Sequence, residues 1–217
     1  GAYKILKNIT KTSELFILFS LKEKYFYDMK DPSKFDENFE KIQLVKKRWG
    51  VRIVINVKNE IYVRLLRYIR DFLNSEFSFP DYAQWFIKWR WIFTNASHHL
   101  NKKVVINADI KDFFPSIKLE QVTSIMREIG FSNEVAEVLT EIVTLQWEVP
   151  AGFHTSPVLA NLVFRGIDTQ LNLFAKNNWY IYTRYADDMT FSSDSLDYII
   201  TKKDLNLILN PHGFFVN

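Results

Sequence analysis

Residues 184–193 read RYADDMTFSS, and they place two adjacent carboxylates, Asp187 and Asp188, between apolar stretches. The preceding WYIYTRY (179–185) and the following MTFSS (189–193) have the β-branched and aromatic composition of strands. The pattern therefore predicts two strands joined by a tight link that carries both aspartates. Asp is common in solvated turns, so that ordinary explanation stays open for this stretch alone.

A second acidic position follows another predicted strand. The stretch KKVVINADI (102–110) is apolar until it reaches Asp109, and Asp112 lies three residues further on. If the strands are neighbours in one sheet, Asp109 approaches Asp187 and Asp188, and three carboxylates in one place need a cation. Mg²⁺ prefers oxygen ligands, and two such ions stabilise both oxygens of an in-line displacement at phosphorus. A strand end with an ordinary salt bridge is the alternative for Asp109.

The rest of the chain mixes strands and helices without strict alternation. Residues 51–57 (VRIVINV) have strand composition, and the polar stretch 30–43 indicates a loop or a short helical connection. Gly130 is a good helix end, and Thr155 or Ser156 is a good helix cap. Apolar periodicity predicts helices at 60–74, 119–131, 135–146 and 154–176. This order indicates an α+β fold.

Composition narrows the class of protein. Hydrophobic residues make up 47% of the 217 residues and aromatic residues 16%, enough for a core and too many for a disordered chain. The sequence has no cysteine, which excludes disulfides and thiolate zinc sites. No signal peptide is evident, and the longest apolar run, LFILFSL (15–21), is too short to span a bilayer. We therefore expect a cytoplasmic protein with no membrane partner.

Charge is distributed unevenly along the chain. The net charge is only +3, but residues 41–70 hold nine basic side chains and one acidic side chain. Such a one-sided segment favours a polyanionic partner such as nucleic acid, and a solvated basic face is the equally weighted alternative. The basic residues are Lys41, Lys46, Lys47, Arg48, Arg52, Lys58, Arg64, Arg67 and Arg70.

Three stretches together resemble the motifs of reverse transcriptases, in the form found in bacterial retron-type enzymes. They are INADIKDFFPSI (106–117), VPAGFHTSPVLANL (149–162) and RYADDMTFSS (184–193), and they occur in the family's order and spacing. More loosely, KKRWGVRIVINV (46–57) resembles the family's fingers segment, and WFIKWRWIFTNASHHL (85–100) resembles its G-F-x-x-G-R-S-x-x-x-N-A stretch. The resemblance thus extends over residues 46–217.

The resemblance implies a right-hand polymerase fold of fingers and palm, with an antiparallel palm sheet packed on helices. Residues 1–100 would form an N-terminal segment and the fingers, and residues 101–217 the palm, the two interleaved as one reverse transcriptase domain. We expect the thumb that family members carry after the last motif to be absent or truncated.

The resemblance also implies roles for individual residues. Asp109, Asp187 and Asp188, with the backbone carbonyl of Ile110, would hold two Mg²⁺ ions, or Mn²⁺ in their place. Phe114 would exclude the 2′-hydroxyl of an incoming nucleotide. The set that binds the deoxynucleoside triphosphate would be Lys46, Arg52, Asp112, Phe113, Phe114, Ala151 and Gly152. The set that contacts the template would be Trp85, Lys88, Trp89, Arg90 and Asn95. His98 and His99 are expected at the surface or on nucleic acid.

The sequence departs from the family pattern at several of these positions. Ala151 replaces the usual glutamine, Phe153 and His154 replace a small residue and a proline, and Trp91 replaces a serine. Tryptophan replaces the expected glycine at Trp49, Trp85 and Trp89. The tryptophans either pack inside a lobe or narrow the template channel, because aromatic faces can stack on bases.

The function implied is that of an RNA-directed DNA polymerase that uses two magnesium ions, in an antiviral defence system. Its partners would be an RNA template, a DNA primer or product, deoxynucleoside triphosphates, and an accessory protein or noncoding RNA. Two alternatives remain. One is a template-independent or protein-primed DNA polymerase of an abortive-infection type system, and the other is an inactive polymerase-like module that binds RNA or protein.

Overall fold

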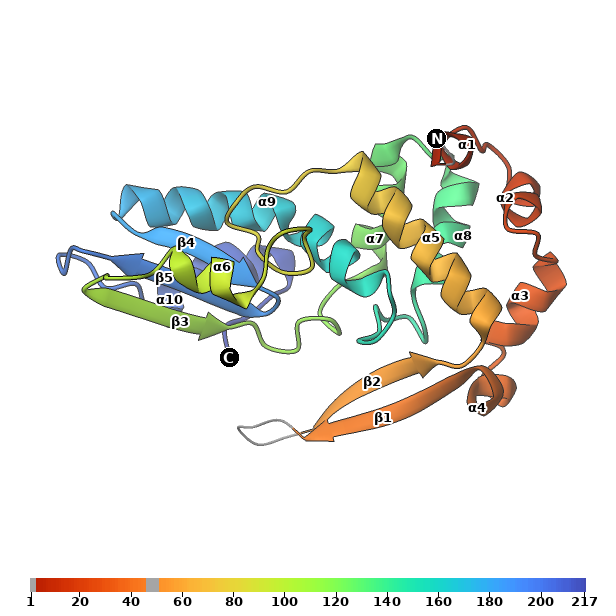
Figure 1. Ribbon diagram of the computed structural model, residues 1–217, viewed down its shortest axis with the longest axis horizontal. Helices are drawn as coiled ribbons and strands as arrows, with labels where there is room; N and C mark the ends of the chain where they lie inside the picture. The colour runs from red at the N-terminus through yellow and green to blue at the C-terminus, as the bar shows by residue number, and fades with distance from the viewer. Residues whose placement is uncertain (1–2, 46–50) are drawn as a thin grey trace. The chain divides into compact units, whose positions relative to one another are not determined.

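The computed structural model describes residues 3–45 and 51–217, and it has an α+β fold with two antiparallel sheets (Figure 1). Residue contacts divide the chain into two compact units. The first unit contains residues 1–77 and 118–156, and the second contains residues 78–117 and 157–217. The boundary expected between residues 100 and 101 lies within the second unit.

The first unit combines a two-stranded sheet with helices. Its strands are β1 (Phe39–Val45) and β2 (Val51–Val57), paired antiparallel from Phe39↔Val57 to Val45↔Val51. The predicted strand at 51–57 is therefore confirmed, but the expectation of a loop or helical connection at 30–43 is wrong for residues 39–43. Residues 39–43 form part of β1 because pairing with β2 satisfies their backbone hydrogen-bonding groups. The helices are α1 (Tyr3–Lys7), α2 (Thr12–Leu18), α3 (Glu23–Lys30), η1 (Pro32–Lys34), α4 (Phe35–Asn38), α5 (Glu60–Glu76), α7 (Leu119–Ile129) and α8 (Asn133–Val143).

The helix ends of the first unit follow the capping chemistry of the sequence. The Asn59 side chain accepts hydrogen bonds from the backbone N–H groups of Ile61 and Tyr62 and begins α5. Gly130 takes φ +108° and ends α7, as predicted. Helix α8 begins before the predicted residue 135 because the Ser132 side chain accepts from the backbone of Val135 and caps the helix. The α5 face that the periodicity predicted is buried at Leu65, Leu66, Ile69, Phe72 and Leu73. The prediction is wrong for Ile61, which is exposed, and Tyr62 is buried in its place.

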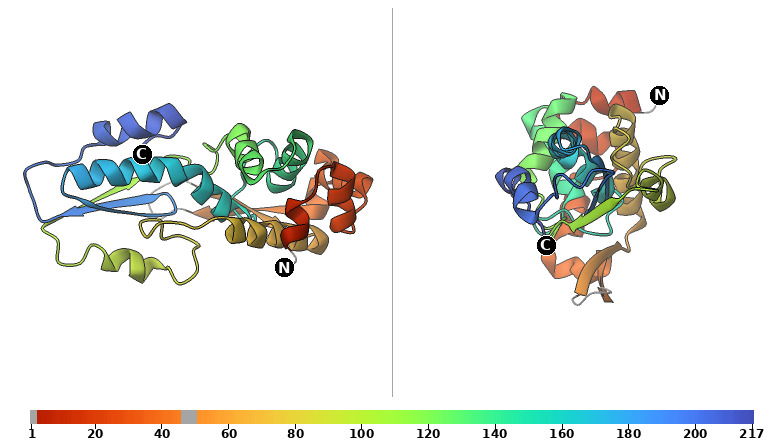
Figure 2. Two further views of the ribbon diagram at one scale, coloured as in Figure 1. Left: turned by 90° about the horizontal axis from the view of Figure 1, so that it is seen from above. Right: turned by 90° about the vertical axis from the view of Figure 1, so that its left-hand side faces the viewer.

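The second unit is built around a three-stranded sheet. The strand order is β3-β5-β4, and both pairings are antiparallel. Figures 1 and 2 show α9 running along this sheet, with α6 and α10 on opposite sides. The strands are β3 (Val104–Asp109), β4 (Ile181–Tyr185) and β5 (Asp188–Ser193), and the helices are α6 (Ile92–Ser97), α9 (Ser156–Asn177), α10 (Lys202–Leu209) and η2 (Asn210–His212). In the central strand β5, every residue after Asp188 is buried.

The start of α9 differs from the expected hydroxyl cap. The Ser156 hydroxyl donates to the carbonyl of Pro150, 2.6 Å away, because the chain folds back in a turn before the helix. The Thr155 hydroxyl is buried and has no hydrogen-bond partner within the part of the chain that the structure describes. The expected cap at Thr155 or Ser156 is therefore not confirmed.

Candidate active site

The sheet of the second unit brings Asp109 and Asp188 directly opposite one another. They form the last pair of the β3–β5 register, at the end of β3 and the beginning of β5. The directly opposite Cα atoms of an antiparallel pair lie about 4.5–5.5 Å apart. The Ile110 backbone N–H donates to the carbonyl of Asp187, 2.9 Å away, so Asp187 is also held at this end of β3. The expected approach of the three acidic residues is thus present in the backbone.

The link that carries the aspartates is a two-residue turn with a strained residue. Ala186 and Asp187 connect β4 to β5, and Ala186 has φ +58°. Two-residue hairpin turns usually place glycine where the first central residue has positive φ, because L side chains are disfavoured there. Strained backbone at such a turn is typical of functional sites. Asp188 is exposed, and Asp109 and Asp187 are half-buried.

The carboxylates do not form a complete metal cluster. Among the residues that the structure describes, no three His, Cys, Asp or Glu side chains are arranged to hold one metal ion. The expectation that all three carboxylates converge is therefore not confirmed. The opposed pair Asp109 and Asp188 still offers the hard oxygen donors that Mg²⁺ prefers. That ion commonly binds through one or two carboxylates and completes its shell with water and substrate phosphates, so the residues present fit it.

Asn217 contacts Asp109, a contact that sequence reasoning missed. Its backbone N–H donates to the Asp109 carbonyl at 2.8 Å, and its side-chain amide donates to Asp109 Oδ2 at 3.1 Å. The neighbouring Val216 forms an antiparallel bridge with Ile110. The apolar pattern at 214–217 indicated only a further apolar element, and no feature of the sequence pointed to Asp109.

The residues after β3 separate into surface and core. Asp112 is exposed, with φ +45°. Phe113 is buried, and its ring centroid lies 5.2 Å from that of Phe164, so its side chain belongs to the core. Phe114 is half-buried, and its ring lies 5.8 Å from that of Trp85. The nucleotide contacts expected of Asp112, Phe113 and Phe114 stay predictions.

In the first unit, Gly152 allows a close approach, and the partner is protein backbone. The Ile55 N–H donates to the Ala151 carbonyl at 2.7 Å, which joins this turn to β2. A Cβ atom at Gly152 would lie 2.3 Å from the Ile55 carbonyl oxygen. Arg52 lies on the exposed part of the same strand. The nucleotide contacts expected of Arg52, Ala151 and Gly152 stay predictions, and Lys46 and Trp49 lie outside the described residues.

Several tryptophans that replace glycine or serine are exposed. Trp89 is 76% exposed and Trp91 is 55% exposed, so neither packs in a core. Trp89 has φ +67°, so the backbone keeps a conformation that favours the glycine expected there. Trp85 is half-buried and packs against Phe86, with ring centroids 4.9 Å apart. Exposed aromatic faces of this kind can stack on bases.

The polar residues of the same segment differ in their partners. The Lys88 ammonium lies 5.3 Å from the centroid of the Trp89 ring. The Arg90 guanidinium donates to the carbonyls of Ala83 at 2.7 Å and Phe79 at 2.9 Å, so this side chain fixes the loop before it. The Asn95 side-chain oxygen is buried and has no hydrogen-bond partner among the described residues. The template contacts expected of Lys88, Arg90 and Asn95 stay predictions.

His99 is buried, so its expected place at the surface or on nucleic acid is wrong. Its Nδ1 lies 2.6 Å from the Ser192 hydroxyl, and its Nε2 lies 2.7 Å from the Thr183 hydroxyl. Burial, with a smaller effect of His98, lowers the pKa of His99 to about 4. The neutral ring can donate to one hydroxyl and accept from the other, which protonation would prevent. His98 is exposed.

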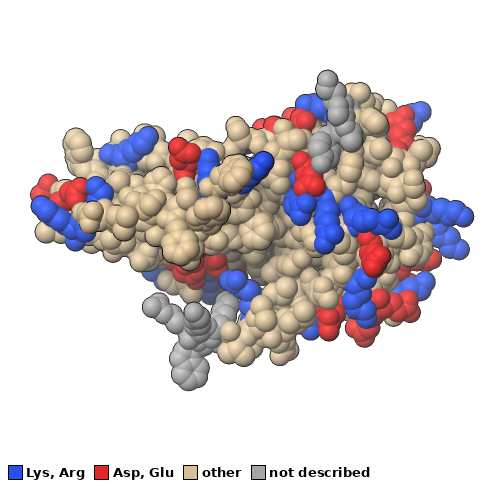
Figure 3. Space-filling model, viewed as in Figure 1, with Lys and Arg blue, Asp and Glu red and all other residues tan. Residues whose placement is uncertain are grey.

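A basic face lies on α5. The periodicity of this helix places the exposed Arg64 and Arg67 away from its buried face, and lysine and arginine side chains gather over it in Figure 3. The pKa of His154 is lowered, first by burial and then by the charges of Arg67 and Arg70. The neighbouring arginines therefore create a positive potential in the first unit, as a polyanion-binding surface requires.

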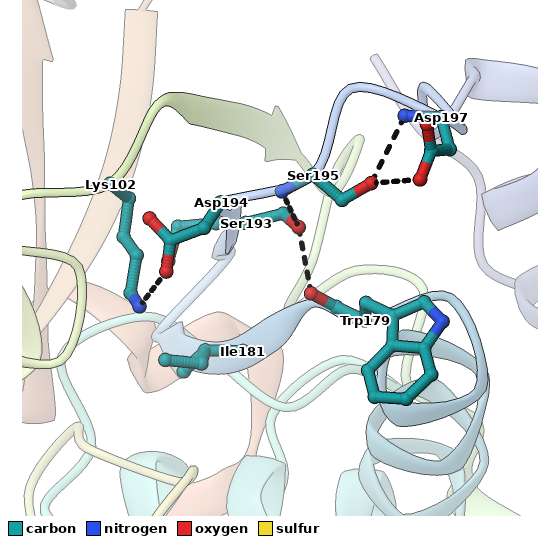
Figure 4. Close-up of a pocket in the computed structure, with 8 residues that line it drawn as sticks. Lys102, Trp179, Ile181, Ser193, Asp194, Ser195 and Asp197 are labelled. Carbon is teal, nitrogen blue, oxygen red and sulfur yellow. Dashed lines mark hydrogen bonds and ion pairs between the residues drawn. The ribbon is translucent and has the colours of Figure 1, made fainter.

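An open pocket in the second unit lies away from the aspartates. It has a volume of about 430 Å³ and lies at the end of the sheet where Val104 pairs with Ser193 (Figure 4). Lys102 donates to Asp194 at 2.7 Å, and the Ser193 hydroxyl donates to the Trp179 carbonyl at 2.7 Å. The polar groups of this pocket bind each other, and nothing here contributes to the carboxylate site.

No helix within residues 3–45 and 51–217 combines the length and the apolar character that a membrane crossing requires.

The family model described as "Reverse transcriptase (RNA-dependent DNA polymerase)" matches residues 41–211. The chain is 33% identical over 154 residues to the retron Ec86 reverse transcriptase of Escherichia coli, which covers 70% of this chain and 47% of that protein. It is 30% identical over 210 residues to the retron Mx65 reverse transcriptase of Myxococcus xanthus, which covers 88% and 49% respectively. The retron Se72 reverse transcriptase of Salmonella heidelberg (strain 579083-10) is 37% identical over 136 residues, covering 60% and 36%. The chain thus spans about half the length of the first two of these relatives.

Proposed function

Since the chain belongs to the reverse transcriptase family, we propose that it carries the catalytic centre of an RNA-directed DNA polymerase. Asp109, Asp187 and Asp188 would be the catalytic carboxylates, and Mg²⁺ would be the metal. The observation that carries the proposal is the register of the second unit's sheet, which pairs Asp109 with Asp188 beside the Ala186–Asp187 turn. The reaction would be nucleotidyl transfer, in which a primer 3′-hydroxyl displaces pyrophosphate from a deoxynucleoside triphosphate.

The chain's own contribution would be positioning and charge. Two bound Mg²⁺ ions would neutralise charge on the attacking and leaving oxygens, as in other two-metal sites. Asp109 offers its carboxylate from the end of a regular strand, which fixes its direction. The hydrogen bond from Ile110 to Asp187 ties the turn to that strand at 2.9 Å. The nucleotide-contact roles of Lys46, Arg52, Asp112, Phe113, Phe114, Ala151 and Gly152, and the metal-ligand role of the Ile110 carbonyl, belong to the same proposal.

The binding of an RNA template is supported by two surfaces, one on each unit. The arginines of α5 offer positive charge, and the exposed rings of Trp89 and Trp91 offer stacking faces. The relatives named above are retron reverse transcriptases, so a noncoding RNA is the partner we propose besides template and primer. A role in antiviral defence rests on the same analogy.

Template-independent synthesis is the second candidate, and the specific observation that favours it is Trp89. A bulky, exposed side chain stands where the backbone has kept a glycine-like φ of +67°. The family's glycine implies that a template strand approaches closely here, and a tryptophan would leave less room for that strand.

The proposal is tested by incorporation of labelled deoxynucleotides on a primed RNA, with Mg²⁺, using the protein in its full natural length. We expect Asp109→Asn and Asp188→Asn each to reduce incorporation by about 100- to 1000-fold, the scale of losing an electrostatic catalytic group. The matched control is Asp194→Asn, since Asp194 lies in the same unit at the other end of the sheet. Equal activity in the wild type and Asp188→Asn would refute the assignment.

A further inference from the structure

A fully buried arginine, Arg184, lies two residues before the Ala186–Asp187 turn. The Arg184 side chain has no exposed surface, and its guanidinium binds Asp168 of α9 in a fork. Nε donates to Asp168 Oδ1 at 2.8 Å, and Nη2 donates to Asp168 Oδ2 at 2.7 Å. Burying a charge costs several kcal/mol unless it is paired and hydrogen-bonded, so most N–H groups of the guanidinium need acceptors. Some of these N–H groups donate to acceptors other than Asp168.

One of these donors reaches the turn itself. Arg184 Nη1 donates to the carbonyl of Ala186 at 2.9 Å. Ala186 is the turn residue with φ +58°, and the next two residues are Asp187 and Asp188. The guanidinium therefore connects the long helix α9 to the backbone that presents the aspartates. A strained φ persists only where its surroundings hold it.

The remaining contacts fix the orientation of the guanidinium. Nη2 also donates to the side-chain oxygen of Asn161 at 3.1 Å, and the Asn161 amide donates to the Trp85 carbonyl at 2.8 Å. The Phe164 ring lies beneath the guanidinium, 4.8 Å away. The Tyr182 hydroxyl donates to Asp168 Oδ1 at 2.7 Å and orients the carboxylate. Both the Arg184 guanidinium and the Asp168 carboxylate thus have further contacts, which fix the direction in which Nη1 points.

Stability alone does not require this arrangement. Well-packed apolar residues often replace a buried ion pair with no loss of stability, and sometimes with a gain. An apolar side chain cannot donate to the Ala186 carbonyl, and a lysine cannot provide the planar fork that reaches Asp168 and Ala186 together. The feature unique to arginine here is therefore the link between α9 and the turn.

We infer that Arg184 is a positioning residue, which holds the Ala186 carbonyl from α9 and so fixes the turn that presents Asp187 and Asp188. The inference deepens the proposed function, and only the expected effect of Arg184 on metal binding and catalysis rests on that function. The effect of Arg184 on the position of the turn can be measured separately. The Ile110 N–H donates to the Asp187 carbonyl, so hydrogen exchange at Ile110 reports the position of the turn.

The test uses two variants. Arg184→Lys keeps the charge beside Asp168 and removes the fork. Arg184→Met combined with Asp168→Leu and Tyr182→Phe removes the polar groups together, so that no buried charge is left unpaired. We expect both variants to fold, with exchange at Ile110 about tenfold faster, as the loss of one hydrogen bond predicts. Exchange at Tyr180, which donates to Ala175 at 2.8 Å away from the turn, should not change.

The same variants give a metal readout and a catalytic one. We expect the Mg²⁺ concentration for half-maximal incorporation to rise about tenfold, and Mn²⁺ binding, followed by its electron paramagnetic resonance signal, to weaken by a similar factor. His99→Gln is the control, because it disturbs a different buried polar group of the same unit. It should leave the Mg²⁺ dependence of incorporation and the Mn²⁺ binding unchanged.

The outcomes separate the two hypotheses. Unchanged exchange at Ile110 in folded variants would overturn the positioning role. Faster exchange with unchanged metal dependence would overturn its catalytic consequence. A wild type that neither binds Mn²⁺ nor incorporates nucleotide would refute the proposed function, and exchange at Ile110 would then decide the positioning role alone.

Discussion

Replacing Gly152 with alanine tests the close contact between its turn and β2. Gly152 has φ +108°, and a Cβ atom there would lie 2.3 Å from the Ile55 carbonyl oxygen and 2.8 Å from Val54 Cγ1. The carbonyl cannot retreat freely, since Ile55 is paired with Lys41 in the sheet and its N–H binds Ala151. The substitution must therefore either separate the turn from β2 or distort the strand.

Gly130 supplies a matched comparison for the magnitude. It has the same φ of +108°, but a Cβ atom at Gly130 would have no neighbour within 4 Å. Gly130→Ala should therefore cost only the backbone strain, about 1–2 kcal/mol. Gly152→Ala should cost this strain and a further 1–3 kcal/mol, roughly, for forcing atoms into a packed site. The expected total for Gly152→Ala is about 2–5 kcal/mol.

The assay is urea-induced unfolding of the two variants and the wild type, followed by circular dichroism, with the free energy of unfolding extrapolated to water. We expect Gly152→Ala to lose more stability than Gly130→Ala. Equal losses would show that the contact with Ile55 carries no cost, and a smaller loss for Gly152→Ala would refute the geometry of the turn.

Three further predictions concern the exposed tryptophan, the buried histidine and the basic face. Trp89→Gly should not reduce stability, because glycine suits φ +67°. It should weaken the binding of single-stranded RNA, measured by fluorescence anisotropy, by about 1–3 kcal/mol. Trp179, with φ +64° and 81% exposure, is the control, and an equal effect of Trp179→Gly on RNA binding would contradict a specific stacking role of Trp89. The pKa of His99 is lowered to about 4, so the unfolded chain takes up the proton first, and stability should fall as the pH drops from about 6.5 to 4. In chemical denaturation at several pH values, His99→Gln should show a shallower fall over that range, and an identical pH profile would be evidence against the buried neutral ring. Replacing Arg64 and Arg67 with alanine should reduce the slope of log affinity for RNA against log salt by about 1 per arginine, and an unchanged slope would exclude these side chains as phosphate contacts.

Much of the fold could be predicted from local patterns. The stretch 51–57 is apolar and rich in β-branched residues, and it forms a strand as predicted. Gly130 ends α7 because glycine adopts positive φ without strain. Strand β1 was missed because all of its residues after Phe39 are exposed and half of them are polar, and only pairing with β2 makes it a strand.

The candidate site could be predicted only where its chemistry is local. Asp187 and Asp188 are neighbours in sequence, and Asp109 stands where the apolar run of residues 102–110 becomes polar. The buried network of Arg184 and Asp168 joins residues 16 positions apart on a helix and a strand, so no local pattern indicates it. His99 was misplaced for the same reason, because the hydroxyls of Thr183 and Ser192 that satisfy it come from β4 and β5, which lie more than 80 residues further along the chain.

We propose that templated DNA synthesis takes place at the carboxylates where β3 and β5 pair Asp109 with Asp188. The most direct measurement is to supply a primed RNA of defined sequence with Mg²⁺ and all four deoxynucleotides, and to sequence the DNA that the full-length protein makes. We expect DNA complementary to the supplied RNA, and no such product from Asp188→Asn. DNA whose sequence is independent of the RNA, or the same product from the wild type and Asp188→Asn, would contradict it.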